Sequence, residues 1–91
     1  MIEETPEQIA CRIFREQFSA RLTKALSAVS LSQNSMAKRI GGAYSQSTLN
    51  RVAAAKRMPD AYLVVLLANE IGCNAEWLLT GEGDSGLKER C

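Results

Sequence analysis

The chain has 91 residues, a formal net charge of +1 and a hydrophobic content of 46%, which suit one small domain with a modest core. No run of about 18 or more apolar residues occurs and the N-terminus MIEETPEQ is acidic, so neither a membrane span nor a secretory signal is expected, and the protein is predicted to be cytoplasmic. The three cysteines are widely spaced and histidine is absent, which argues against a zinc site; no metal and no cofactor is expected.

The first predicted helix begins at Pro6. Thr5 suits the N-cap, proline is favoured at the first helical position, and Gln8 stands at the capping-box position. Apolar residues then recur at three- and four-residue steps and define one stripe: Ile9, Ile13, Phe14, Phe18, Leu22, Ala25, Leu26 and Val29. The pattern predicts one continuous helix to about Ser30. The alternative is a break in which Ser19 caps a second helix.

Two short helices are predicted next, each opened by a serine N-cap. The first follows Ser32 and ends at the glycine pair 41–42, because glycine readily takes the left-handed conformation at a helix terminus. Its inward residues are Met36, Ala37 and Ile40. The second follows Ser45, and its inward residues are Leu49, Val52 and Ala53. The alanines at 53–55 are expected to prolong it by a turn, given the helix propensity of alanine.

Two further helices complete the predicted all-α fold. Asp60 caps a helix over 61–71, and Asn74 caps a short helix that ends near residue 80; a glycine closes each of them. The remaining residues, 82–91, are polar and rich in glycine, which is typical of a flexible tail or linker.

The cysteines are interpreted as structural residues. Cys11 and Cys73 are expected to act as small apolar residues near a core, and Cys91 as a thiol in the tail. The sequence holds no plausible nucleophile paired with a base, no glycine-rich phosphate loop and no carboxylate cluster with metal-ligand spacing. The chain is therefore not expected to be an enzyme.

Charge is strongly segregated along the chain. Residues 21–58 hold seven cations and no acid, whereas the segments on either side are net acidic. The cations are Arg21, Lys24, Lys38, Arg39, Arg51, Lys56 and Arg57. Chance clustering of charges that only keep helical faces hydrated is the alternative, but a block of this length concentrates positive potential on the surface that it forms. The distribution predicts a polyanionic partner.

Four stretches have a specific order and spacing: LSQNSMAKRIG, SQSTLNR, AKRMPD and IGCNAEWLLTGEG. Together they resemble the lambda-repressor-like (Cro/CI-type, XRE) helix-turn-helix family, and most closely the N-terminal domains of phage repressors. The resemblance covers Phe18 to Gly83 and implies a five-helix DNA-binding domain. It divides the chain into an N-terminal helical extension (1–17), the helix-turn-helix domain (18–81) and a flexible tail or linker (82–91).

The resemblance also implies which residues meet DNA. Base edges in the major groove are assigned to Gln46, Ser47, Asn50 and Arg51. Phosphate contacts are assigned to Gln33, Lys24, Lys38, Tyr44, Ser45, Lys56 and Arg57, whereas Arg21 and Arg39 are expected to lie farther from DNA. Independently of the family, glutamine pairs bidentately with adenine and arginine with guanine, while serine and asparagine are adaptable hydrogen-bonding groups. The alternative for the base-reading set is a merely hydrated helix face.

One departure from the family lies between the two short helices. The turn here is GGAY, residues 41–44, and it is longer than in most family members, which leaves the angle between the two helices open. Tyr44 either bonds a phosphate through its hydroxyl or packs over the junction.

The resemblance implies a sequence-specific regulator of transcription that binds double-stranded DNA, a phage or prophage repressor that occupies an operator and blocks polymerase. An inverted repeat bound by a homodimer is expected, since one such domain buries little surface and paired half-sites raise specificity. The alternative is a helical protein-interaction module, such as an antitoxin-like or polymerase-contacting partner. RNA binding is disfavoured, because no aromatic platform accompanies the basic residues.

Overall fold

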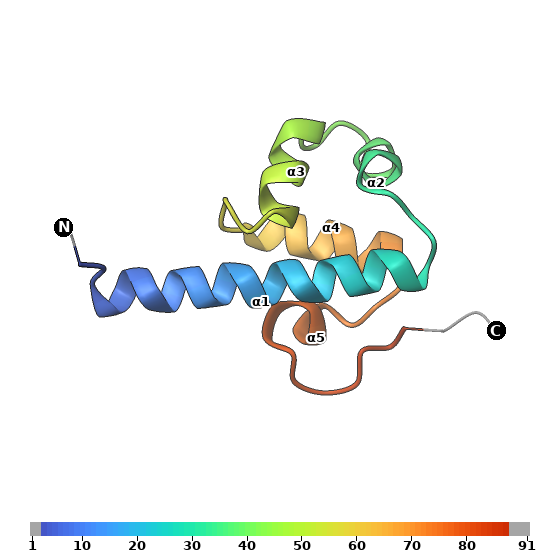
Figure 1. The fold of residues 1–91 in the computed structure, drawn as a ribbon. Coiled ribbons are helices and arrows are strands. Elements are labelled where there is room, and N and C mark those ends of the chain that lie inside the picture. Colours follow the sequence, from blue (N-terminus) through green and yellow to red (C-terminus); the bar gives the residue numbers. More distant parts are fainter. Residues whose placement is uncertain (1–2, 88–91) are drawn as a thin grey trace.

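The computed structural model describes residues 3–87, and these residues form five helices and no strand. In chain order the helices are α1 (Pro6–Ala28), α2 (Gln33–Arg39), α3 (Gln46–Ala53), α4 (Ala61–Ile71) and α5 (Ala75–Thr80). Figure 1 shows α2 and α3 on one side of α1 and α5 on the other, with the N-terminal part of α1 extending past the bundle. The predicted all-α fold is confirmed, and none of these helices is long and apolar enough to cross a membrane.

The N-terminus of α1 has the predicted capping box. Thr5 Oγ1 accepts a hydrogen bond from the Gln8 backbone N–H (3.2 Å), and Gln8 Oε1 accepts one from the Thr5 backbone N–H (2.8 Å). From there the helix continues without a break to Ala28. The alternative in which Ser19 opens a second helix is therefore wrong.

One hydrophobic core joins the five helices. Its fully buried large side chains are Phe18, Leu22, Met36, Leu49, Val52, Leu63, Leu67 and Leu78. The apolar stripe predicted on α1 is buried only from Phe18 onward, because Ile9 and Ile13 lie on the projecting part and are 38% and 44% exposed. Phe14 is half-buried and stacks on Phe18, with ring centroids 6.4 Å apart. The boundary expected at residue 17 thus falls inside a helix that contacts the core from Phe14.

The serine caps of the two short helices are present as predicted. Ser32 Oγ accepts a hydrogen bond from the Ser35 N–H and Ser45 Oγ accepts one from the Thr48 N–H, each at 3.1 Å. The glycine pair 41–42 has φ values of 68° and 78°. These left-handed values explain why the pair ends α2.

The prediction that the alanines after α3 prolong the helix is wrong. The helix ends at Ala53, and Ala55 has a left-handed φ of 63°. In this conformation the Ala55 N–H donates to the Val52 carbonyl (3.1 Å) and the Lys56 N–H donates to the Arg51 carbonyl (2.9 Å), which is the pattern that closes a helix at a left-handed residue. The helix propensity of alanine, worth less than about 1 kcal/mol per residue, is outweighed here.

The C-terminal helices are capped as predicted, by Asp60 at α4 and by Asn74 at α5. The chain after α5 then folds back onto the domain. The Asn74 N–H donates to the Ser85 carbonyl (2.8 Å), and Leu87 packs against the core. The segment 82–91, expected to be a flexible tail or linker, is therefore tied to the domain as far as Leu87.

The cysteines differ in their surroundings. Cys11 is exposed on the projecting part of α1, so its interpretation as a residue near the core is wrong. Cys73 is half-buried against the core, and desolvation raises the pKa of its thiol. Cys91 lies outside the described residues.

Candidate nucleic-acid interface

The outward face of α3 gathers the residues predicted to read bases. These residues are Gln46, Ser47, Asn50 and Arg51, and all four are exposed. They fall on one side of the helix because residues four apart lie above one another, while Leu49 and Val52 point into the core. With Ala54 and Lys56 they line a shallow hollow of about 490 Å³. The fold thus brings all four onto one surface and adds a cation to it.

Gln46 is held in place from α2. Its Nε2 amide donates a hydrogen bond to Asn34 Oδ1 across the turn between the two helices. Asn34 is not among the residues predicted from the sequence; its neighbour Gln33 is, and the Gln33 side chain is half-buried. A signal was present, since both are polar residues in the first turn of α2, but which of them turns toward α3 depends on how the two helices cross.

The two cations at the end of α2 point in different directions. Lys38 lies one turn after Asn34, on the same side of the helix, and is exposed. Arg39 Nη1 lies 3.9 Å from Glu70 Oε2 on α4. Lys38 therefore faces the side on which α2 meets Gln46, whereas Arg39 is directed to α4.

The basic residues in the second half of α1 are turned away from α3. Arg21 donates to the carbonyls of Leu78 and Leu79 at the end of α5, at 2.9 and 2.8 Å, and partial burial lowers its pKa. Lys24 lies about 180° around α1 from Arg15, whose side chain contacts the end of α3. The structure therefore does not bring Lys24, a predicted phosphate contact, to the α3 face.

The longer turn is fastened to α4 through Tyr44. Its hydroxyl donates a hydrogen bond to the carboxylate of Asp60, the N-cap of α4, and its ring lies against Tyr62, with centroids 6.3 Å apart. This bond raises the pKa of Tyr44 and lowers the pKa of Asp60. Of the two alternatives for Tyr44, the structure has the one in which the side chain packs over the junction. Its hydroxyl donates to the Asp60 carboxylate and not to a phosphate.

The remaining predicted phosphate contacts lie at the two ends of α3. Ser45 is its N-cap, and its hydroxyl lies 2.9 Å from the hydroxyl of Thr48. Lys56 and Arg57 follow the helix in the loop to α4, and both are exposed. The bond from the Lys56 N–H to the Arg51 carbonyl keeps the start of this loop beside the outward face of α3.

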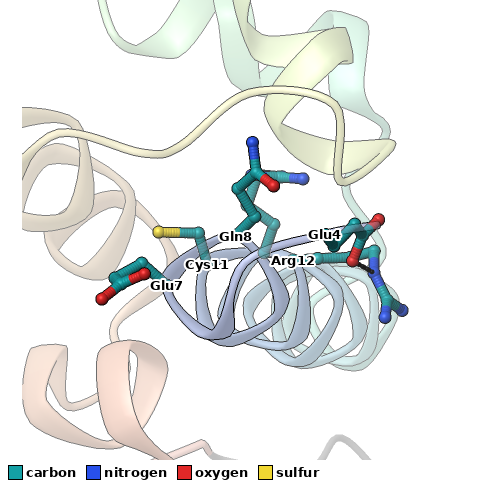
Figure 2. A pocket seen from close by; sticks show the side chains of 6 residues that line it. Glu4, Glu7, Gln8, Cys11 and Arg12 are labelled. Carbon is teal, nitrogen blue, oxygen red and sulfur yellow. Dashed lines mark hydrogen bonds and ion pairs between the residues drawn. The ribbon is translucent and has the colours of Figure 1, made fainter. Parts of the chain in front are cut away.

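A second hollow, of about 520 Å³, lies along the projecting part of α1. Figure 2 shows Glu7, Cys11 and Arg12 standing out from this single helix, together with Glu4 from the segment just before it. Arg12 pairs with Glu4 (3.2 Å) and with Glu16 (3.4 Å), so the charges on this surface largely cancel. It has neither the enclosing walls of a ligand site nor the positive potential that attracts a polyanion.

Comparison with known proteins agrees with this geometry. Residues 22–78 match the helix-turn-helix family, a range that includes α2, α3 and α4 and excludes the projecting part of α1. The chain is also similar to the HTH-type transcriptional regulators for the conjugative elements R391 of Providencia rettgeri, SXT of Vibrio cholerae and pMERPH of Shewanella putrefaciens. Each is 33% identical to it over 69 residues. The aligned region is 76% of this chain and spans only 31% of the length of these curated relatives, and no solved structure matches the chain.

Proposed function

The chain belongs to the helix-turn-helix family, and from this premise we propose that it regulates transcription by binding double-stranded DNA sequence-specifically, with α3 in the major groove. The observation that supports this most is the outward face of α3, where four exposed polar side chains share one surface with Lys56. No acid occurs anywhere in residues 21–58. A helix face that is merely hydrated does not require the exclusion of acids, whereas a face opposed to phosphates does.

Base reading is assigned to the four polar residues of this face, Gln46, Ser47, Asn50 and Arg51. Glutamine matches the N6 and N7 groups of adenine, and arginine matches O6 and N7 of guanine. Because Asn34 accepts a hydrogen bond from the Gln46 amide, Gln46 presents its carbonyl and its second N–H to the groove with little freedom to rotate.

Phosphate contacts are assigned to the half-buried Gln33 and to the exposed residues Lys38, Ser45, Lys56 and Arg57. Contacts of this kind fix the orientation of the protein on the duplex and carry no sequence information directly. Tyr44 and Lys24 are left out of this set, because a carboxylate engages the hydroxyl of the first and the second is turned away from α3.

We infer that two copies bind an inverted repeat and that occupancy of this operator blocks polymerase. A single copy offers one α3 to one half-site, and pairing two half-sites multiplies specificity. The similar bacterial proteins are regulators for conjugative elements. We therefore propose that the operator lies on a mobile element, which includes conjugative elements as well as the phage or prophage implied by the sequence. Binding takes place in the bacterial cytoplasm.

The test is selection of bound DNA from a random library at fixed salt. Enrichment of an inverted repeat supports both sequence-specific binding and binding by two copies. Enrichment of a lone half-site supports sequence-specific binding but contradicts binding by two copies. A variant that combines Gln46→Ala with Arg51→Ala is the control, and it should retain its helical circular dichroism and lose the enrichment. No enrichment by the wild-type chain withdraws the proposed function in favour of a helical protein-interaction module.

A further inference from the structure

Two side chains of α1 hold the C-terminal end of α3. Ser19 Oγ donates a hydrogen bond to the Ala53 carbonyl, and Arg15 Nε donates one to the Ala55 carbonyl at 3.1 Å. The partners are 34 and 40 positions apart in the sequence, so both bonds are tertiary contacts between helices.

The Ser19 bond satisfies the Ala53 carbonyl, which the end of α3 leaves without an intrahelical partner, and the Arg15 bond satisfies the Ala55 carbonyl just beyond the helix. The carbonyls of Arg51 and Val52 are used by the left-handed turn, whereas those of Ala53 and Ala55 receive the donors from α1. The guanidinium of Arg15 also lies at the negative end of the α3 dipole, where a cation is favourable. The α1 donors thus stabilise the turn that stops α3.

The same turn carries two of the residues assigned to DNA. The Lys56 N–H donates to the Arg51 carbonyl, so the backbone of both residues moves with the turn that Arg15 and Ser19 hold. At the other end of α3, Gln46 is held separately by its bond to α2. A displaced turn therefore tilts the C-terminal half of α3 while Gln46 stays near its position.

We propose that Arg15 and Ser19 are positioning residues for DNA reading, which set the orientation of the C-terminal half of α3 without touching DNA. The inference rests on the proposed function, because orientation matters only if α3 reads bases. It gives a role to a part of α1 that precedes the family match at residue 22. The free end of α1 before residue 14 takes no part in it.

The test compares Arg15→Gln and Ser19→Ala with the wild-type chain on the selected operator and on operators changed at one base pair at a time. Both variants are expected to lose roughly tenfold in discrimination at the base pair read by Arg51, a part of what one bidentate contact supplies. Discrimination at the base pair read by Gln46 should stay unchanged. Arg15→Lys and Ser19→Thr keep a donor and should recover most of the loss.

Arg12→Gln is the matched control for charge. It lies on the same helix and removes the same charge, but its partners are Glu4 and Glu16 on the N-terminal segment. It should leave discrimination at every base pair as in the wild type. A loss at the Arg51 base pair equal to that of Arg15→Gln overturns the proposal, because it makes the effect one of charge rather than of the bond.

Two other results also overturn it. If Arg15→Gln weakens binding to all sequences alike and lowers the salt slope by about one, Arg15 contacts a phosphate itself. If both variants lower the melting temperature and leave the discrimination unchanged, the bonds are structural only.

If the wild-type chain binds no DNA, the proposed function fails. Whether Arg15 and Ser19 hold the end of α3 is then tested in the free protein. Amide hydrogen exchange reports local opening. Loss of either α1 donor should speed exchange of the Lys56 N–H about tenfold while the Thr48 N–H, at the other end of α3, stays as slow as before. Equal rates for Lys56 in variant and wild type would overturn the positioning role itself.

Discussion

Arg51 and Lys56 line the same hollow, but they project from different kinds of backbone. Arg51 stands in the last turn of α3, and Lys56 stands in the loop that closes the helix. Arg51→Ala is expected to cost about 1–3 kcal/mol on the preferred operator and to relax the requirement at one base pair. Lys56→Ala should weaken all sequences nearly alike and lower the salt slope by about one. Binding to matched and mismatched duplexes at several salt concentrations measures both.

The longer turn before α3 could change the angle of this helix on DNA, and that would contradict the roles assigned to Arg51 and Lys56. If α3 is tilted, Arg51 meets the phosphate backbone of the DNA. Arg51→Ala then weakens binding to all sequences alike, as Lys56→Ala does, and only Gln46→Ala changes base preference. If no substitution on the outward face changes base preference, the assignment of α3 to the major groove has to be withdrawn.

The hydrogen bond between Tyr44 and Asp60 makes part of the stability depend on pH. It lowers the pKa of Asp60, so its contribution is present at neutral pH and is lost as the pH falls through that lowered pKa. It raises the pKa of Tyr44, so the contribution is also lost as the pH rises through that raised value. Tyr44→Phe keeps the ring against Tyr62 and removes only the hydroxyl.

We therefore expect Tyr44→Phe to melt slightly below the wild type near neutral pH. The difference should close only in acid, once the pH falls below the lowered pKa of Asp60, because Asp60 is then protonated in both proteins. Thermal melting over a pH series measures it. A difference that persists unchanged at low pH would show that the ionised carboxylate is not the partner that matters.

At the scale of elements, the end of α3 holds an alanine in a conformation that suits glycine. Ala55 has a φ of 63°, where a Cβ is unfavourable by roughly 1–2 kcal/mol. Ala55→Gly is expected to stabilise the fold by about 0.5–1 kcal/mol, measured by urea unfolding. Ala54→Gly is the control, because Ala54 has a φ of −91° and gains nothing from glycine. Equal effects at both positions would mean that Ala55 is not left-handed in solution.

The first turns of α1 and the part that begins at Phe14 are expected to contribute unequally to stability. Residues 3–10 are all exposed, and helical turns without packing partners are marginal in water, so deleting residues 1–10 should leave the melting temperature nearly unchanged. Phe14→Ala removes a half-buried ring and should cost about 2 kcal/mol, less than a fully buried phenylalanine. Mass in solution is measured alongside. A shift to a smaller species on deletion would instead assign Ile9 and Ile13 to an interface between copies.

At the scale of the whole molecule, folding divides the basic block into two groups. Arg21 is directed to α5, Arg39 to α4, and Lys24 is turned away from α3. The cations that remain around the α3 face are Lys38, Arg51, Lys56 and Arg57. The positive surface offered to DNA is therefore smaller than the charge pattern of the sequence indicates.

The salt dependence of binding measures this division. The logarithm of affinity should fall linearly with the logarithm of salt, and Lys38→Ala or Arg57→Ala should each reduce the slope by about 0.9. Lys24→Ala is the matched control and should leave the slope as it is. A flat salt response contradicts the electrostatic account, and a reduced slope for Lys24→Ala contradicts the division of the block.

Local signals predicted the helices because they act within a turn or two of the chain. The caps Thr5, Ser32, Ser45, Asp60 and Asn74 each bond to a backbone N–H two or three residues away, which is why their positions can be read without knowing the fold. The predicted end of α3 was wrong, and the observed end is held by donors from α1. Alanine propensity carries no information about such donors.

By itself, then, the sequence determined the order of the helices, their starts, and the shared face of Gln46, Ser47, Asn50 and Arg51, since capping and helical spacing depend only on near neighbours. Only the tertiary structure decided which way individual side chains point and where α3 ends. It selected Asn34 as the partner of Gln46, turned Lys24 away from α3, gave the Tyr44 hydroxyl to Asp60, and ended α3 at Ala53. Each of these depends on how helices that are distant in the chain pack against one another, and a one-dimensional pattern does not encode that packing angle.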